Sequence, residues 1–223
     1  MSITDKENEL FQKWAGNRKG FVADGVADET AYLASVPKLM FVMKEVNDPG
    51  GGNWDQREFM RKGGRLQTWK NITRWVIGIR RLEQDIAWKD LEEISDQQRI
   101  EALRSICAMN LKKSPGGHTT DNDALAAIAE EDVEYINHQF SLYDADLVIC
   151  CGSVTNDVFH SLIKLEAPPE WKITKRGIWF HEYRQRRYII SYSHPEARVQ
   201  DCLLYYGLVD ALREILRGQP AVA

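Results

Sequence analysis

The segment Pro37-Lys-Leu-Met-Phe-Val-Met-Lys-Glu-Val-Asn-Asp-Pro-Gly-Gly-Gly-Asn53 decides the fold that this sequence predicts. Its residues 38–43 form a short, mostly apolar run after a proline, which is typical of a strand buried on both faces. The Asn-Asp-Pro-Gly-Gly-Gly sequence that follows cannot continue a strand and indicates a loop. Glu45, Asn47 and Asp48 therefore come where a buried strand ends. In open parallel sheets, ligands bind at that edge.

Strand-like and helix-like segments alternate along the rest of the chain. Further strands are predicted at 105–111, 145–151, 178–183 and 187–193. Helical spacing of apolar residues predicts helices around 9–14 and over 55–60, 67–82 and 203–216. Three further helices are predicted from capping residues: one from the capping-box pattern at Ser95 to about 104, one from Asp121 through 136, and one that Ser153 caps. This alternation predicts an α/β layer fold around a mainly parallel sheet.

Composition limits the classes of protein to which the chain can belong. With 223 residues, 43% of them hydrophobic, we expect one well-packed domain. The net charge of -4 and the pI of about 5.8 give no global nucleic-acid signature, so such a partner would need a local basic face. The acidic, polar start is no signal peptide and no apolar run would span a membrane, so we expect a cytoplasmic protein.

The four cysteines form no C-x-x-C pair, and three of them lie in apolar strand-like runs. Reduced core cysteines are therefore favoured over disulfides or metal ligands.

Four of the apolar strands run directly into polar or Gly/Pro-rich loops. If these strands are parallel, the four loops meet at one edge of the sheet and form a pocket for a planar polar ligand with nearby phosphates. The loops carry Glu45, Asn47 and Asp48; Asn110, Lys112 and Lys113; Gly152 and Ser153; and His194.

In order and content these loops resemble the motifs of the uracil-DNA glycosylase superfamily. The matching stretches are Lys44-Glu-Val-Asn-Asp-Pro-Gly50, Ile106-Cys-Ala-Met-Asn-Leu-Lys-Lys-Ser-Pro-Gly-Gly117, Leu147-Val-Ile-Cys-Cys-Gly152 and His194-Pro195-Glu196. The resemblance covers about 36–217. It implies a three-layer α/β/α sandwich around a mainly parallel four-stranded sheet, as a single domain over 1–223 with an N-terminal helix in 1–20.

The sequence departs from the family pattern in three places. The first motif has one residue more than the form G-x-N-P-G, and Glu196 stands where the family usually has serine. The N-terminal C-x-x-C of the branches with an iron–sulfur cluster is absent, so we expect no cluster and no other cofactor or metal.

Cleavage of an N-glycosidic bond requires stabilisation of a departing base anion and a water positioned below the sugar. His194 is the candidate donor to the anion, since a neutral imidazole can stabilise an oxyanion. The water-positioning role stays open between Asn47, Asp48 and Glu45, in that order of preference. Asn110 would read uracil with its amide oxygen accepting from N3–H and its amide nitrogen donating to O4.

The remaining roles follow the resemblance. Either Trp54 or Phe59 would stack on the base. DNA would be held by Lys112, Lys113, Ser114, Ser153 and Arg198, on a flipped-out nucleotide if the substrate is duplex.

Three functional classes compete at this point. The first is a monomeric, monofunctional glycosylase that removes uracil or a modified pyrimidine from single- or double-stranded DNA. The second is a catalytically silent module on the same fold that binds DNA or a nucleotide. A small-molecule α/β enzyme is the third, but the sequence has neither G-K-[ST] after a glycine loop nor G-x-S-x-G.

Overall fold

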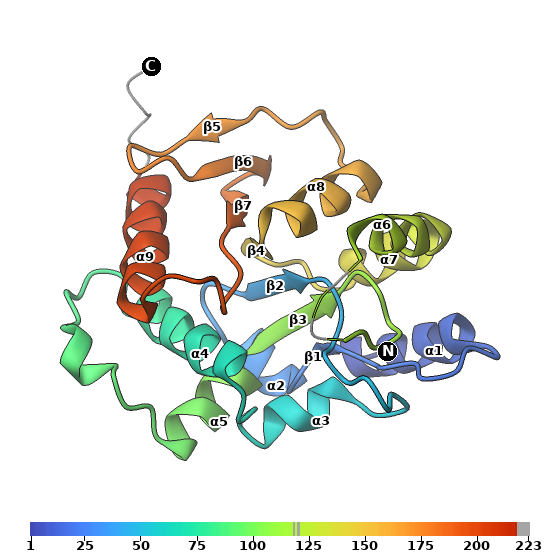
Figure 1. The fold of residues 1–223 in the computed structure, drawn as a ribbon. Coiled ribbons are helices and arrows are strands. Elements are labelled where there is room, and N and C mark those ends of the chain that lie inside the picture. Colours follow the sequence, from blue (N-terminus) through green and yellow to red (C-terminus); the bar gives the residue numbers. More distant parts are fainter. Residues whose placement is uncertain (118, 120, 218–223) are drawn as a thin grey trace.

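The computed structural model describes residues 1–117, 119 and 121–217 of the chain. Its elements are α1 (Ile3–Ala15), β1 (Gly25–Val26), α2 (Glu29–Leu33), β2 (Leu39–Met43), α3 (Gln56–Arg61), α4 (Gln67–Arg80), a short 3₁₀ helix (Trp88–Asp90), α5 (Asp96–Arg104), β3 (Ile106–Asn110), α6 (Asn122–Glu131), α7 (Val133–Ser141), β4 (Leu147–Cys151), α8 (Ser153–Leu162), β5 (Lys172–Ile173), β6 (Trp179–Arg184), β7 (Arg187–Tyr192) and α9 (Asp201–Arg217). Figure 1 shows their arrangement. The protein is a mixed α/β fold, as predicted.

Within the described residues, seven strands form one sheet in the order β1-β3-β2-β4-β7-β6-β5. The four inner strands β3, β2, β4 and β7 are parallel to their neighbours. Strand β1 is antiparallel at one edge, and β6 and β5 extend the other edge in antiparallel pairing. The expected sheet of four strands is therefore wrong in number. Of the three further strands, β6 was predicted as a strand, whereas β1 and β5 have two residues each, too few to give a periodic pattern in the sequence.

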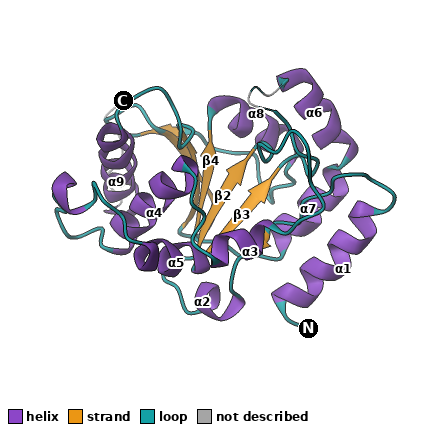
Figure 2. Cartoon of the chain, turned by 60° about the horizontal axis from the view of Figure 1, so that its bottom comes forward, coloured by secondary structure: helices purple, strands orange, loops and turns teal. Residues whose placement is uncertain are grey.

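Helices cover both faces of this sheet, as Figure 2 shows. Strand β2 alternates between two hydrophobic clusters: Leu39 and Phe41 pack with α4 and α9, whereas Met40 and Val42 pack with α1, α7 and α8. All five β2 residues are buried, which explains the continuous apolar run. The three cysteines of β3 and β4 are buried free thiols, in agreement with the sequence prediction.

Two helix predictions need correction. The long helix expected from Asp121 is broken into α6 and α7 at Asp132, whose buried carboxylate accepts hydrogen bonds from the Arg18 guanidinium at 2.5 and 2.6 Å. Ser153 does not cap α8: Gly152 occupies the N-cap position with a φ of 109°, and Ser153 is the first helical residue.

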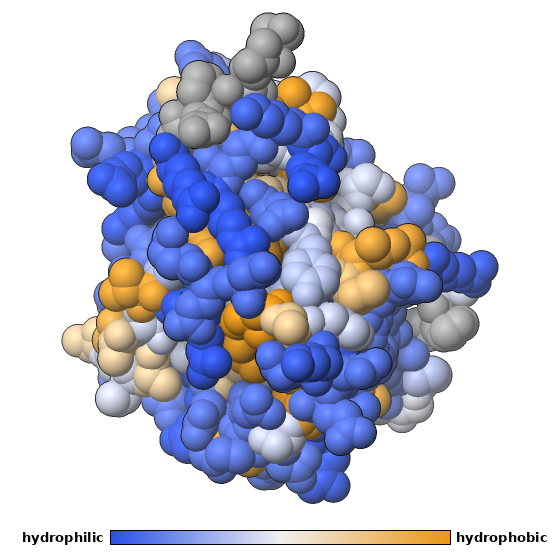
Figure 3. All heavy atoms as spheres, turned by 90° about the vertical axis from the view of Figure 1, so that its left-hand side faces the viewer, coloured by the Kyte–Doolittle hydropathy of each residue, from blue (hydrophilic) through white to orange (hydrophobic). Residues whose placement is uncertain are grey.

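Among the described residues, no helix combines the length and apolar character needed to cross a membrane. Figure 3 shows the face on the left of Figure 1, where hydrophilic residues surround several separate apolar patches.

Candidate active site

The carboxyl ends of the four parallel strands lie at one edge of the sheet. Met43 pairs with Asn110 across β2 and β3, and Cys151 pairs with Tyr192 across β4 and β7. Val42 of β2 lies opposite Cys150 of β4. The loops that carry the predicted site residues therefore leave the sheet side by side, as expected for parallel strands.

The loops after β2 and β3 remain paired beyond the strands. The Lys112 amide donates to the Lys44 carbonyl at 2.9 Å, and the Gly116 amide donates to the Val46 carbonyl at 2.9 Å. Gly116 also packs against Glu45, since a Cβ at this glycine would lie 2.1 Å from Glu45 Oε1. This continued pairing gives both loops a defined course at the edge of the sheet.

The three candidates that follow β2 have different environments. Glu45 accepts from Lys112 Nζ at 3.0 Å, and its side chain is 5% exposed. Asp48 Oδ2 accepts from the Gly52 amide at 2.8 Å and from Trp54 Nε1 at 2.9 Å, and these bonds lower the pKa of Asp48. Asn47 is exposed, and its side chain makes no hydrogen bond to any described residue. Asn47 is thus the one of the three whose side chain has no hydrogen-bond partner among the described residues.

Asn110 lies at the end of β3 and is 2% exposed. Its side-chain nitrogen donates to Asp24 Oδ2 at 3.1 Å and to Gln56 Oε1 at 2.8 Å, while its backbone amide donates to Asp24 Oδ2 at 2.7 Å. Both amide hydrogens are therefore engaged within the protein. The expected donation from Asn110 to O4 of a base does not fit this geometry, whereas the expected role of the amide oxygen as an acceptor does.

Lys113 belongs to the core of the protein. Its ammonium donates to both oxygens of Asp24 at 2.7 Å and to the Asn110 carbonyl at 2.8 Å, and it lies 4.7 Å from the centre of the Trp14 ring. Burial lowers the pKa of Lys113. A side chain in this position does not reach a phosphate, so Lys113 leaves the set of predicted DNA contacts.

His194 follows β7, and its ring nitrogen Nδ1 accepts from the Glu196 backbone amide at 3.1 Å. A nitrogen that accepts carries no proton, so the proton of the neutral ring is on Nε2. Burial lowers the pKa of His194, which keeps the imidazole neutral near pH 7. The site therefore offers one oriented N–H donor at the end of β7.

Glu196 has a structural role. Its Oε1 accepts from the Thr68 amide at 2.9 Å and from the Thr68 hydroxyl, in the first turn of α4. Helix α4 has no cap from its own N-cap residue, Leu66, so Glu196 satisfies an amide that would otherwise lack a partner. On the same helix, Asn71 Nδ2 donates to the Pro195 carbonyl at 2.7 Å. Together these bonds hold the His194 turn against α4.

The other predicted residues lie around this edge. Ser153 is exposed at the start of α8, Ser114 is half-buried and Arg198 is exposed. The half-buried Trp54 is 6.0 Å from Phe59 between ring centres, and Phe59 packs against the core cluster next to Trp69. Lys112 is 15% exposed and paired with Glu45.

The buried polar residues Asp24, Gln56 and Gln139 were missed by the sequence analysis. Asp24 lies in the apolar stretch Phe21-Val-Ala-Asp-Gly-Val-Ala27, and a lone carboxylate in such a stretch signals a buried partner. Gln139 Nε2 donates to Asp24 Oδ1 at 2.7 Å, which brings α7 to the same carboxylate.

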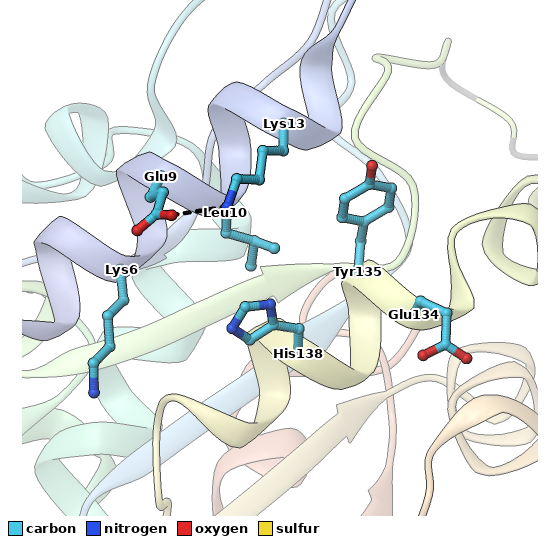
Figure 4. A pocket seen from close by; sticks show the side chains of 7 residues that line it. All are labelled: Lys6, Glu9, Leu10, Lys13, Glu134, Tyr135 and His138. Atoms are coloured by element: carbon cyan, nitrogen blue, oxygen red, sulfur yellow. Dashed lines mark hydrogen bonds and ion pairs between the residues drawn. The ribbon is translucent and has the colours of Figure 1, made fainter.

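A cavity of about 350 Å³ lies elsewhere, between α1 and α7 (Figure 4). Its lining residues are Lys6, Glu9, Leu10, Lys13, Glu134, Tyr135 and His138. None of these was predicted as a site residue, and the side chains include charges of both signs. In the part of the chain that the structure describes, no three His, Cys, Asp or Glu side chains are grouped as metal ligands.

Comparisons with models of protein families and with curated proteins found no match to this chain.

Proposed function

We propose that the chain is a DNA glycosylase of the uracil-DNA glycosylase type, which hydrolyses the N-glycosidic bond of uracil or a modified pyrimidine in DNA. One observation carries this proposal. The four parallel strands bring Asn47, Asn110 and His194 to the same edge of the sheet, and His194 Nδ1 there accepts from the Glu196 backbone amide, which leaves Nε2 to carry the proton of the neutral ring.

In the proposed reaction the bond between the sugar C1′ and the base nitrogen breaks, and both electrons leave with the base. His194 Nε2–H donates a hydrogen bond to the oxygen of the base on which negative charge develops. The Asn47 amide oxygen orients a water that attacks C1′. Because an amide is a poor base, the water loses its proton to solvent or to the departing base as the new C–O bond forms.

Binding of DNA would rely on a small local surface, because the chain carries a net charge of -4. Lys112, Ser114, Ser153 and Arg198 remain the proposed contacts to the phosphates. With so few cations, affinity for undamaged DNA should be modest and should fall steeply with salt.

A second candidate is a module of the same fold that binds DNA or a nucleotide without cleaving it. Glu45 is paired with Lys112, and Asp48 accepts hydrogen bonds within its own loop. These contacts favour the second candidate, because each carboxylate already has a partner in the protein that competes with a water.

A cleavage assay on oligonucleotides distinguishes the glycosylase from the binding module. Labelled single- and double-stranded oligonucleotides with one uracil are incubated with the protein and treated with alkali, next to matched oligonucleotides with thymine. Strand scission at the uracil alone supports the glycosylase. Gel retardation without scission supports the binding module.

A further inference from the structure

We infer that Asp24 and Gln56 fix the Asn110 amide so that it acts as a hydrogen-bond acceptor only, and that the base bound in the site must present an N–H donor to it. This inference rests on the proposed function, since it takes the edge at Asn110 to be the base-binding site. It assigns Asp24 and Gln56 as positioning residues for base selection.

The amide has one possible orientation. Asn110 Nδ2 donates one hydrogen to Asp24 Oδ2 at 3.1 Å and the other to Gln56 Oε1 at 2.8 Å. A turn of the amide by 180° would bring its oxygen against the Asp24 carboxylate oxygen and remove both bonds. Among the described residues no group donates to Asn110 Oδ1, so the oxygen is the part of the amide left for a ligand.

Asp24 itself is held from several sides. Lys113 Nζ lies 2.7 Å from each of its oxygens, Gln139 Nε2 lies 2.7 Å from Oδ1, and the Asn110 backbone amide lies 2.7 Å from Oδ2. Asp24, Lys113 and Gln139 are all buried. Moving a paired, fully buried carboxylate costs much free energy, so the Asn110 amide has the same orientation before and after a ligand binds.

This geometry defines the class of base. Uracil, thymine and their 5-substituted relatives carry an N3–H donor, which matches a lone acceptor. Cytosine carries a lone pair at N3, which would leave two acceptors facing each other without water. Asn110 therefore selects an imide N–H, and it does not by itself distinguish uracil from thymine, because both present the same edge.

The first measurement concerns the amide itself. In ¹⁵N NMR spectra of the free protein, the side-chain NH₂ of Asn110 should exchange slowly with solvent, because both hydrogens are bonded in a buried site. In Gln56→Ala exchange should be at least about tenfold faster, whereas Gln56→Glu keeps an acceptor oxygen and should preserve the protection. Rapid exchange in the parent protein overturns the inference.

The second measurement concerns the ligand. Two oligonucleotide probes carry a cleavage-resistant 2′-fluoro nucleotide, one with uracil and one with 3-deazauracil, in which a C–H of similar size replaces N3–H. The uracil probe should bind roughly ten- to a hundredfold more tightly to the parent protein and to Gln56→Glu, as expected for one unpaired buried group. The ratio should fall towards one in Gln56→Ala.

The control is a matched oligonucleotide that contains neither uracil nor thymine. If the parent protein binds both probes with equal affinity, and each more tightly than this control, the inference is overturned and the proposed function stands. Failure of the uracil probe to bind above that control, together with no cleavage of uracil DNA, overturns the proposed function and the inference with it. The ratio of the parent protein's affinities for the two probes tests the inference even if Gln56→Ala does not fold.

Discussion

At the scale of single residues, Asn47 and Asp48 are neighbours that differ in their contacts. The Asn47 side chain is exposed and makes no bond to the described residues, while Asp48 closes the glycine loop through Gly52 and Trp54. We expect Asn47→Ala to lower the single-turnover rate on uracil DNA by roughly tenfold or more, with unchanged stability. Asp48→Ala should instead lower the free energy of unfolding, because the Gly52 amide and the Trp54 indole N–H lose their acceptor. Single-turnover rates and urea denaturation are measured for both variants. An unchanged rate in Asn47→Ala would assign the water-positioning role to another residue.

Lys113 gives a second prediction at this scale. Removal of its ammonium would leave the Asp24 carboxylate buried next to Asn110 without its cation. Lys113→Met should therefore lower the free energy of unfolding by about 3–5 kcal/mol.

The exposed pair of Lys164 and Glu134 is the matched control for Lys113. Lys164→Met should change the free energy of unfolding by less than about 1 kcal/mol. If Lys113→Met is as stable as this control and only weakens DNA binding, the structural role of Lys113 is wrong.

At the scale of elements, the His194 turn depends on α4. Glu196 accepts from the Thr68 amide at 2.9 Å in place of a cap within the helix. Glu196→Ala should cost about 1 kcal/mol of stability, as the loss of an N-cap does. It should also speed hydrogen exchange at the turn, whereas Glu196→Gln retains an acceptor oxygen and should behave like the parent. Equal exchange in all three proteins would show that Glu196 does not hold the turn.

The sequence predicts the elements around the site better than it predicts the contacts of the site. Strands β2, β3 and β4 follow from their apolar runs because each is buried on both faces. The lone carboxylate of Asp24 in an apolar stretch indicates a buried partner, but its bonds join residues 86, 89 and 115 positions apart, so the local sequence does not identify the partners. The role of Lys113 was therefore mispredicted, because its neighbours in sequence are loop residues.

For His194 and Asn47, in contrast to Lys113, the sequence predicted the position in the fold. Their positions follow from the strand ends alone, because parallel strands bring the loops at their carboxyl ends to one edge. The tautomer of His194 depends on the Glu196 amide, and this bond is determined only by the course of the turn.

At the scale of the whole molecule, two histidines away from the site link stability to pH. The rings of His160 on α8 and His181 on β6 have centres 4.9 Å apart, and none of their four nitrogens has a partner among the described residues. Burial lowers the pKa of His160 to about 4 and lowers that of His181, while Asp157 opposes the shift of His160.

A histidine with a lowered pKa in the folded state takes up its proton more readily when unfolded. Stability should therefore fall as the pH drops from about 6.5 towards 4, and this loss should level off below the folded pKa. Urea denaturation at pH 7.5 and pH 5.0 measures it, and His160→Phe should lose less stability between these pH values than the parent. An equal loss in both proteins would place the pH dependence in other groups.

The central claim is that the edge formed by Asn47, Asn110 and His194 cleaves the glycosidic bond of uracil in DNA. The most direct measurement is the single-turnover rate of uracil release by the parent protein, His194→Ala and His138→Ala, the last altering an exposed histidine on α7. We expect release by the parent, a rate lower by on the order of 10²–10³ in His194→Ala, and an unchanged rate in His138→Ala. A parent protein that leaves uracil in place, or a His194→Ala variant as fast as the parent, would contradict the claim.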